Sequence, residues 1–305
     1  MTGFGATRPD PTAIGEVSAP PFARLPDPER LFLRRSDRFR TVADGHPLKP
    51  YLLFLADLSS AQHFVQDELD PPALVPPERA FRAEAHGMPP LDRHAFTPDA
   101  ACDQTLDRLL AVFGECEMPD AARAAMRMLA GADRDTRTAM MRAVLAEAVP
   151  IEAIAPHVLI AAALQVDFSR RAATLDAGAL RPVAEGACPC CGAKPVASMV
   201  VDWPGAHGVR FCACSLCATL WHVVRIKCTL CGSTERIGYR HVEGGPDTIK
   251  AETCGTCGRY VKIFHQHKDP ALDPVADDVA SLGLDVLLGD ARDVRGSVNL
   301  FMLGT

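Results

Sequence analysis

The stretch CPCCG at residues 188–192 places three cysteines in four positions and follows them with a glycine. Cys188 and Cys191 form a C-x2-C pair, and a second pair, Cys214 and Cys217, follows after 22 intervening residues. The identical pattern recurs 40 positions later, at Cys228, Cys231, Cys254 and Cys257. Because a repeat at a fixed period indicates a duplicated structural unit, the sequence predicts two similar units in tandem.

Each unit has the ligands for one metal ion. A C-x2-C pair places two sulfur atoms on one tight turn, a cysteine knuckle, and two facing knuckles supply four tetrahedral ligands. The sequence therefore predicts two metal sites, Cys188, Cys191, Cys214 and Cys217 (site 1) and Cys228, Cys231, Cys254 and Cys257 (site 2). In an alternative pairing, the first and third knuckles would share a metal.

The ligand set limits the chemistry of these sites. Four thiolates leave no open position for water, so such metals are structural or carry electrons and do not act as Lewis acids. Thiolates suit zinc, and the same CxxCG knuckles hold one iron ion in rubredoxin. Both iron and zinc therefore remain open at this point.

Two further thiols of this region have no counterpart in the repeat. Cys190 aligns with Leu230, and Cys212 aligns with Glu252. We interpret both as packed thiols that bind no metal. The alternative is an accessory redox pair or a substitute ligand.

The position of the cysteines and the start of the chain bear on the compartment. Ten of the 12 cysteines lie between Cys188 and Cys257, and no apolar leader segment precedes them. In a reducing compartment such pairs are more often metal-binding than disulfide-bonded, so we expect a cytoplasmic protein. The longest apolar stretch, Val158 to Leu164, is too short for a membrane span.

The rest of the chain predicts a multi-domain α+β fold. An arm rich in Pro, Gly and Ala covers residues 1–26, and apolar residues at helical spacing predict an all-helical domain over 27–182. Within it, a helix is expected at about 28–44, whereas the seven prolines of residues 70–100 predict an extended connector. The metal-binding ribbons are expected at 183–225 and 226–268, and a C-terminal segment at 269–305 packs back on the body.

The charge distribution argues against a nucleic-acid-binding protein. Residues 188–268 carry ten Lys or Arg and five acidic residues, while the remainder of the chain has a formal charge of −11. Two zinc tetrathiolates would reduce the ribbon charge to about +1, far from the strongly positive field that phosphate binding requires. No Ser-His-Asp order, phosphate loop or nucleotide fingerprint is present, so we expect no enzyme.

Three segments carry a family resemblance. CPCCGAKPVASMV at 188–200, CSLCATLWHVVRIKCTLCG at 214–232 and IKAETCGTCGRYVKIFHQHKDP at 249–270 resemble FdhE, the formate dehydrogenase accessory (maturation) protein family. The resemblance implies a large helical subdomain followed by two tandem rubredoxin-like units, with iron as the metal. It also implies a cytoplasmic maturation factor, without enzymatic activity, that binds the catalytic subunit of a respiratory formate dehydrogenase. The eight cysteines of sites 1 and 2 carry over position by position.

Other functions remain as alternatives. The chain could be a rubredoxin-type electron-transfer protein, a nucleic-acid-binding zinc ribbon, or a thiol oxidoreductase that uses a free CxxC pair. If the two units are independent, Cys188→Ala and Cys254→Ala should each remove one metal and loosen only the ribbon that carries the change.

Overall fold

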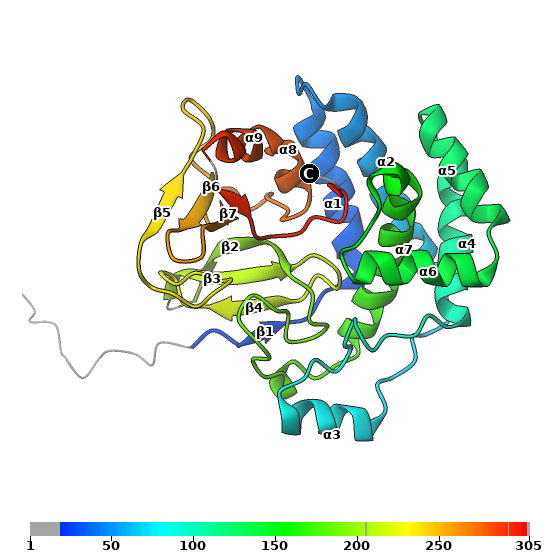
Figure 1. Ribbon diagram of the computed structural model, residues 1–305, viewed down its shortest axis with the longest axis horizontal. Helices are drawn as coiled ribbons and strands as arrows, with labels where there is room; N and C mark the ends of the chain where they lie inside the picture. The colour runs from blue at the N-terminus through cyan, green and yellow to red at the C-terminus, as the bar shows by residue number, and fades with distance from the viewer. Residues whose placement is uncertain (1–18, 205, 292, 304–305) are drawn as a thin grey trace, which may run out of the picture.

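The computed structural model describes residues 19–303 except 205 and 292, and it combines a helical body with a mixed sheet (Figure 1). In Figure 1 the helices of the first half of the chain lie on one side and the strands on the other. The helical body contains α1 (Pro28–Ala43), α2 (Lys49–Val65), α3 (Pro77–His86), α4 (Ala100–Gly114), α5 (Asp120–Gly131), α6 (Arg134–Leu145) and α7 (Ile154–Ala173). Two short helices, α8 (Ala276–Ala280) and α9 (Leu282–Asp290), follow the cysteine-rich region.

Local sequence signals explain several helix boundaries. α1 begins at Pro28, where the proline ring fits the first turn. The Asp99 side chain accepts hydrogen bonds from the backbone N–H groups of Ala101 and Cys102 and so caps α4. Asp133 caps α6 in the same way through the N–H of Thr136. The helix expected at 28–44 is therefore present with nearly the same ends.

The connector predicted over residues 70–100 is wrong in part, because α3 forms inside it. Pro77 begins this helix, and Gly87, which adopts the left-handed conformation with φ of 61°, ends it. The prolines therefore start a helix here where they were expected to keep the chain extended. α3 projects at the periphery of the body, and Ala83 is its buried residue (Figure 1).

α7 is the core helix of the body. Fifteen of its residues are buried, on all sides of the helix, and it contacts α4, α5 and α6. Together with the turn before it, at Ile151–Ala173, it is long and apolar enough to span a membrane, but 67% of the apolar window is buried inside the fold. This apolar helix is longer than the stretch Val158–Leu164 from which the sequence argued against a membrane span. We therefore interpret it as a core helix and not as a membrane span.

One eight-stranded sheet contains all the described strands. They are β1 (Ala23–Arg24), β2 (Pro195–Trp203), β3 (Ala206–Cys214), β4 (Leu220–Val223), β5 (Ile237–Arg240), β6 (Ile249–Cys254), β7 (Arg259–His265) and β8 (Val294–Arg295). Their order is β1-β4-β3-β2-β7-β6-β5, and β8 pairs with β7. The parallel pairing of β2 with β7, Ser198 opposite Ile263, joins the two cysteine units into this single sheet.

The two ends of the chain pack against this framework. β1, which belongs to the arm expected at 1–26, pairs with β4, while residues 1–18 of that arm lie outside the described part. At the C-terminal end, Phe301 is buried in the main core, and Tyr51 of α2 donates a hydrogen bond to its carbonyl oxygen. Arg38 of α1 and Asp277 of α8 form an ion pair of 2.7 Å that further fixes the C-terminal segment on the body.

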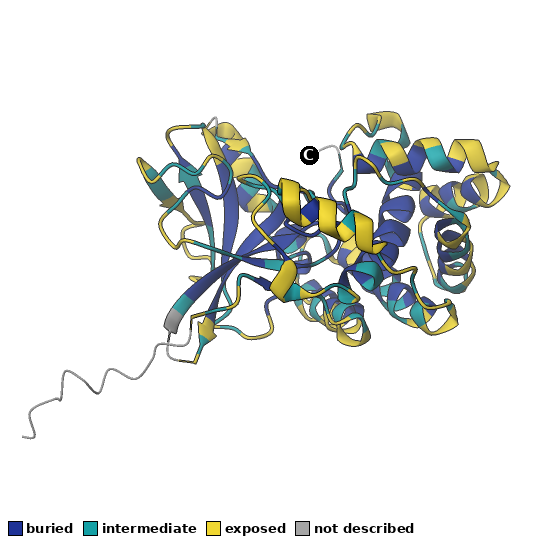
Figure 2. Ribbon diagram, turned by 90° about the horizontal axis from the view of Figure 1, so that it is seen from below, coloured by how far each residue is buried: buried dark blue, intermediate teal, exposed yellow. Residues whose placement is uncertain are grey.

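The main hydrophobic core runs without interruption from the helical body into the first cysteine unit. Buried side chains of α2, α4 and α7 belong to the same cluster as Cys188, Phe211 and Trp221. The second unit has a small cluster of its own, formed by Ala251, Tyr260, Leu284 and Leu288. Figure 2 shows buried inner strands and helices surrounded by exposed outer segments.

Candidate metal centres

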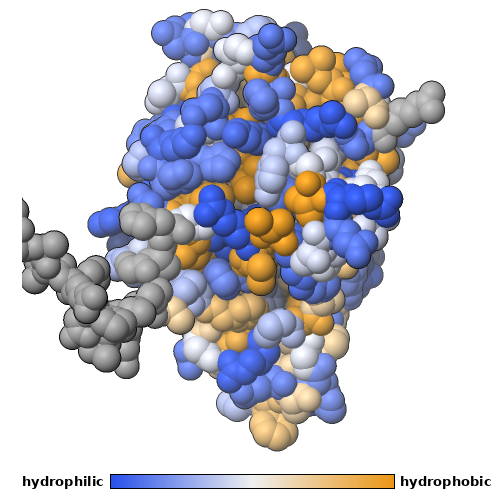
Figure 3. Space-filling model, turned by 90° about the vertical axis from the view of Figure 1, so that its left-hand side faces the viewer, coloured by the Kyte–Doolittle hydropathy of each residue, from blue (hydrophilic) through white to orange (hydrophobic). Residues whose placement is uncertain are grey.

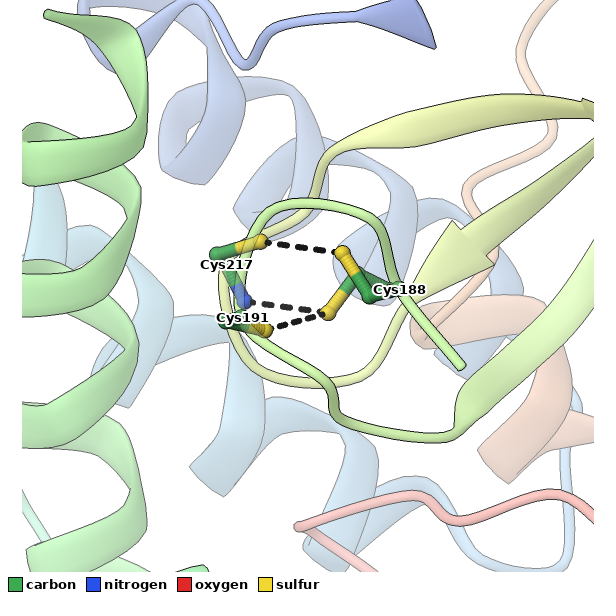
Figure 4. A group of neighbouring side chains, drawn as sticks. Cys188, Cys191 and Cys217 are labelled. Atoms are coloured by element: carbon green, nitrogen blue, oxygen red, sulfur yellow. Dashed lines mark hydrogen bonds between the residues drawn. The ribbon is translucent and has the colours of Figure 1, made fainter. Parts of the chain in front are cut away.

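The structure brings together the four cysteines of each predicted site. Cys188, Cys191, Cys214 and Cys217 form one group, and Cys228, Cys231, Cys254 and Cys257 form the other, with all ligand atoms of a group within 4.8 Å of one another. Figure 4 shows Cys188, Cys191 and Cys217 turned toward one another from two loops. The groups follow the pairing of first with second knuckle and third with fourth, and the swapped pairing is absent from both.

The sulfur–sulfur distances fit tetrahedral metal binding. In site 1 the distances are 3.6 Å between Cys188 and Cys217 and 3.4 Å between Cys191 and Cys214. The corresponding distances in site 2 are 3.9 Å and 3.8 Å. Four sulfurs that each lie about 2.3 Å from one metal ion stand about 3.8 Å apart. A disulfide would need about 2.05 Å, so both groups have the geometry of a metal cage.

The knuckles are built in the same way in both units. Gly192, Gly232 and Gly258 each have a φ near 70°, and the N–H of each donates to the carbonyl oxygen of the first cysteine of its knuckle. This left-handed conformation is readily available to glycine. In the remaining knuckle, Ala218 takes the equivalent position with a φ of 59°. The N–H groups of Leu216 and Cys217 point to the Cys214 sulfur at 3.4 Å, which stabilises a thiolate there.

Each cage contains one thiol whose pKa is lowered by its neighbours. Burial opposes ionisation of Cys217, but hydrogen bonds from the neighbouring thiols lower its pKa well below the ordinary value. Burial also opposes ionisation of Cys254, yet the N–H groups of Cys257 and Thr256 lower its pKa to about 7. Burial raises the pKa of Cys228 to about 12. A lowered pKa favours the thiolate, which is the form that binds a metal ion.

The two cages differ in their exposure to solvent. All four cysteines of site 1 are buried, with exposed fractions between 0% and 2%. In site 2, Cys228 and Cys254 are buried, whereas Cys231 is exposed and Cys257 is half-buried. Site 1 therefore lies inside the main core, and one side of site 2 faces solvent.

The two extra thiols lie beside the cages. Cys190 is buried, and its thiol is close enough to Cys217 to influence the ionisation of that residue. Cys212 on β3 is also buried, and burial raises its pKa to about 12. Its thiol neighbours Thr229, which stands between the first two cysteines of site 2. Neither thiol belongs to a group of four.

A buried ion pair joins the first unit to the second site. The Arg210 guanidinium on β3, with its side chain 0% exposed, donates to both carboxylate oxygens of Glu252 at 2.8 and 2.9 Å. It also donates to the carbonyl oxygens of Arg225 and Lys227, directly before Cys228. Glu252 precedes Cys254 by two residues. Arg210 therefore binds chain segments next to both knuckles of site 2.

Sequence reasoning missed Arg210 and Glu252. The two residues lie 42 positions apart on strands of different units, and their pairing depends on the parallel contact between β2 and β7. The one available signal was the position of Glu252 within a strand beside a knuckle. A charged side chain that is buried there requires a partner of opposite charge. Lys262, fully buried against Asp278 and Asp285 of the C-terminal helices, is a second pair of this kind.

A groove on the helical body is lined almost entirely by apolar side chains. This groove measures about 480 Å³, and its lining includes Tyr51, Phe54, Ile154, Val158 and Leu159 together with neighbouring alanines and prolines. Its one ionisable group is Tyr51, and burial raises the pKa of Tyr51 to about 12. The groups of metal-capable side chains contain cysteines and no histidine in the part of the chain that the structure places.

Comparison with known proteins covers nearly the whole chain. Three families match in order: FdhE, N-terminal, over residues 20–185; FdhE, central domain, over 187–225; and FdhE, C-terminal domain, over 226–302. A "Protein FdhE homolog" of Rhizobium meliloti is 44% identical over 299 residues, which are 97% of this chain and 98% of the relative. A homolog of Pseudomonas aeruginosa is 36% identical over 300 residues, 94% of this chain and 96% of the relative.

A solved structure has the same fold. The crystal structure of the FdhE protein from Pseudomonas aeruginosa matches with a TM-score of 0.83 at 35% identity, and it covers 93% of this chain and 99% of that one. The mixed arrangement of helices and sheet described above is therefore that of a known protein structure.

Proposed function

Because the chain belongs to the FdhE family, we propose that it is a maturation factor that binds the catalytic subunit of a respiratory formate dehydrogenase in the cytoplasm. The match over nearly the full length is the observation that carries this proposal. The helical body and the ribbons would provide the binding surface. The protein would act on the enzyme before it becomes active and would not be an enzyme itself.

We further propose that the eight cysteines hold two metal ions, iron or zinc, in rubredoxin-like units. The cage geometry and the N–H groups directed at Cys214 support this assignment. When bound, each metal would cross-link two knuckles and could, if it is iron, carry one electron. The cysteines themselves orient the four sulfurs, and the core around site 1 excludes water from that cage.

Gene deletion tests the maturation role. Without the gene, formate dehydrogenase activity should disappear while the catalytic subunit is still made, as measured by an activity stain and an immunoblot of the same extract. Wild-type chain supplied from a plasmid should restore activity. A protein with Arg127→Glu, an exposed change on α5 away from both cages, should restore it equally well. Full activity in the deletion strain would contradict the proposal.

Elemental analysis together with the visible spectrum tests the metal assignment. Two iron or two zinc ions per chain are expected, and ferric thiolate would absorb visible light and bleach with a reductant. A protein whose eight cysteines all react with a thiol reagent in the folded state would contradict metal binding and would favour a thiol oxidoreductase.

A rubredoxin-type electron-transfer protein is the second candidate. The exposure of Cys231 favours it, since an electron can leave a metal site most readily where a ligand sulfur faces solvent. Reversible bleaching of an iron-loaded protein would support this function, and a colourless protein loaded with zinc would exclude it. A nucleic-acid-binding ribbon is the weakest candidate because the ribbons carry little net charge once metals are counted.

A further inference from the structure

The sheet ends at β5, and the outer side of this strand carries no described neighbour. β5 is the last strand in the sheet order, and β6 is its pairing partner. In Figure 1 this strand of the second unit lies at the outer edge of the molecule. An open edge presents backbone N–H and C=O groups that can pair with a further strand.

The register shows which backbone groups are open. The N–H of Gly255 donates to the carbonyl of Arg236, one position before the paired residues Ile237 and Cys254, so this bond sets the alternation along the ladder. Hydrogen-bonded and non-hydrogen-bonded pairs alternate along antiparallel strands, so Gly238 and Arg240 also bond to β6, whereas Ile237 and Tyr239 direct their N–H and C=O groups outward.

The opposite side of β6 gives an independent check of this register. The backbone N–H of His265 on β7 donates to the carbonyl of Thr248. Thr248 and every second residue after it therefore bond to β7. Positions 251, 253 and 255 of the same segment are then left for β5, as the bond from Gly255 requires. Two residues of β5 therefore offer four backbone groups to a partner.

Side chains beside this edge favour contact with another molecule. Tyr239 on β5 is 48% exposed, and Ile226 and Cys231 of the same unit are exposed as well. Figure 3 shows the face of the molecule on this side, where apolar side chains lie among polar ones. Ile237 of β5 pairs with Cys254, a cysteine of site 2, so a partner strand at β5 would lie close to that site.

The charges at the two ends of the edge select the partner. Arg236 and Arg240 are exposed and flank the outward-facing residues. In antiparallel pairing with a second copy centred on Gly238, Arg236 of one copy would oppose Arg240 of the other, and like charges directly opposite are destabilising. A strand with acidic residues at these two positions would instead gain an ion pair at Arg236, and it could compete with Asp293 for Arg240.

We propose that the open edge of β5 binds an extended, acidic segment of a partner protein by strand addition. Backbone hydrogen bonds to Ile237 and Tyr239 give the affinity, and the flanking arginines select acidic residues four positions apart. The identity of the partner rests on the proposed function, which makes it the catalytic subunit of formate dehydrogenase. A continuous polyanion such as nucleic acid fits less well, because it would also place negative charge beside the exposed Glu235 and Glu243, which flank β5.

Proline substitution separates the backbone contact from the side chain. Tyr239→Pro removes the outward N–H but no backbone bond to β6, whereas Tyr239→Ala keeps that N–H. Both variants lose the bond from the Tyr239 hydroxyl to Glu252, so this loss cancels in the comparison. Binding of the full-length, metal-loaded chain to the purified catalytic subunit would be measured by biolayer interferometry. We expect Tyr239→Pro to weaken binding roughly tenfold more than Tyr239→Ala, because one partner carbonyl loses its donor.

Further variants keep the test decisive. The metal content of Tyr239→Pro shows whether site 2 is intact, and if it is not, Arg236→Glu, which leaves the backbone unchanged, takes over the test. Arg236→Glu should weaken binding about threefold, and the control Arg127→Glu on α5 should leave it unchanged.

The outcomes distinguish the two proposals. If the wild-type chain does not bind the subunit at all, the proposed function fails. If it binds, and both Tyr239→Pro with two metals and Arg236→Glu bind as tightly as their controls, the β5 inference is overturned while the proposed function stands. A wild-type dimer that Tyr239→Pro abolishes, or binding to single-stranded DNA in place of the subunit, would also overturn it.

Discussion

The two cysteine cages have the same spacing and nearly the same geometry, yet they lie in different surroundings. Site 1 is enclosed by the main core, which it shares with the helical body, and its four cysteines are at most 2% exposed. Site 2 lies outside that core, and Cys231 faces solvent. Identical ligand spacing therefore says little about what each metal does. The surroundings favour a structural role for the first site and an exchange or contact role for the second.

One contact between the units lies directly beside the second site. Arg210 of the first unit holds Glu252 and the chain directly before Cys228, so the second site is built partly on the first. The first site receives its support from the helical body; for example, Leu91 donates a backbone hydrogen bond to Cys190. We therefore expect loss of the first site to affect the second more than the reverse.

Ligand removal gives the largest expected effect. Cys188→Ala should leave the chain without either metal, because the core around site 1 loosens and Arg210 loses its position. Cys254→Ala should retain one metal in a folded body. A structural metal contributes roughly 10 kcal/mol or more to folding, so the first variant should also melt at a much lower temperature. Elemental analysis and thermal melting measure both effects.

The opposite result is equally informative. The sequence alone predicts independent units, in which each substitution removes one metal. Equal loss of one metal from Cys188→Ala and from Cys254→Ala would support that prediction and would remove the asymmetry proposed here.

The Arg210 contact should have the next largest effect. Arg210→Met leaves the Glu252 carboxylate buried without its cation, and breaking such a pair typically costs about 3–5 kcal/mol. We expect this variant to lose the metal of site 2 and to keep that of site 1, as measured by metal content and by denaturant unfolding.

A double variant provides the matched control. Arg210→Met with Glu252→Met removes both charges, and it should recover part of the lost stability because no unpaired charge stays buried. If Arg210→Met keeps two metals and unfolds at the wild-type denaturant concentration, Arg210 does not support the second site.

The sequence predicts the two groups of four cysteines because cysteine spacing is local. Two residues between cysteines define a knuckle, and the 40-residue repeat indicates which knuckles belong to one unit; the structure brings the same four sulfurs together in each unit. The helix at 28–44 was also predictable, since Asp27-Pro28 and Gly45 mark its ends. These signals lie within a few residues of the feature they predict.

The difference between the cages could not be predicted in this way. Burial of site 1 depends on α7 and the C-terminal residues, which lie far away in the sequence. The single sheet depends on β2 pairing with β7 about 65 positions later, and the hydrophobic pattern of neither strand specifies that neighbour. α3 was missed because prolines that can start a helix also predict extended chain.

Chelator kinetics should show a smaller difference. Because Cys231 and Cys257 are accessible, a chelator such as EDTA can attack the metal of site 2 directly, whereas site 1 must first open. We expect two phases of metal release, the faster at least about tenfold quicker, which corresponds to about 1.4 kcal/mol. Cys254→Ala protein should show the slow phase alone. A single phase in the wild type would mean that the two sites are equally accessible.

The extra thiols should give the smallest effect. Cys190 and Cys212 are buried, and burial raises the pKa of Cys212 to about 12, so this thiol stays protonated and unreactive at neutral pH. Cys190→Ala and Cys212→Ala should therefore each keep two metals and lose only about 1 kcal/mol of unfolding free energy. In the wild type, iodoacetamide should leave both thiols unmodified until the protein unfolds, which mass spectrometry can measure. Loss of a metal from Cys190→Ala would instead identify Cys190 as a ligand. The two sites would then use cysteines at different positions of the repeat.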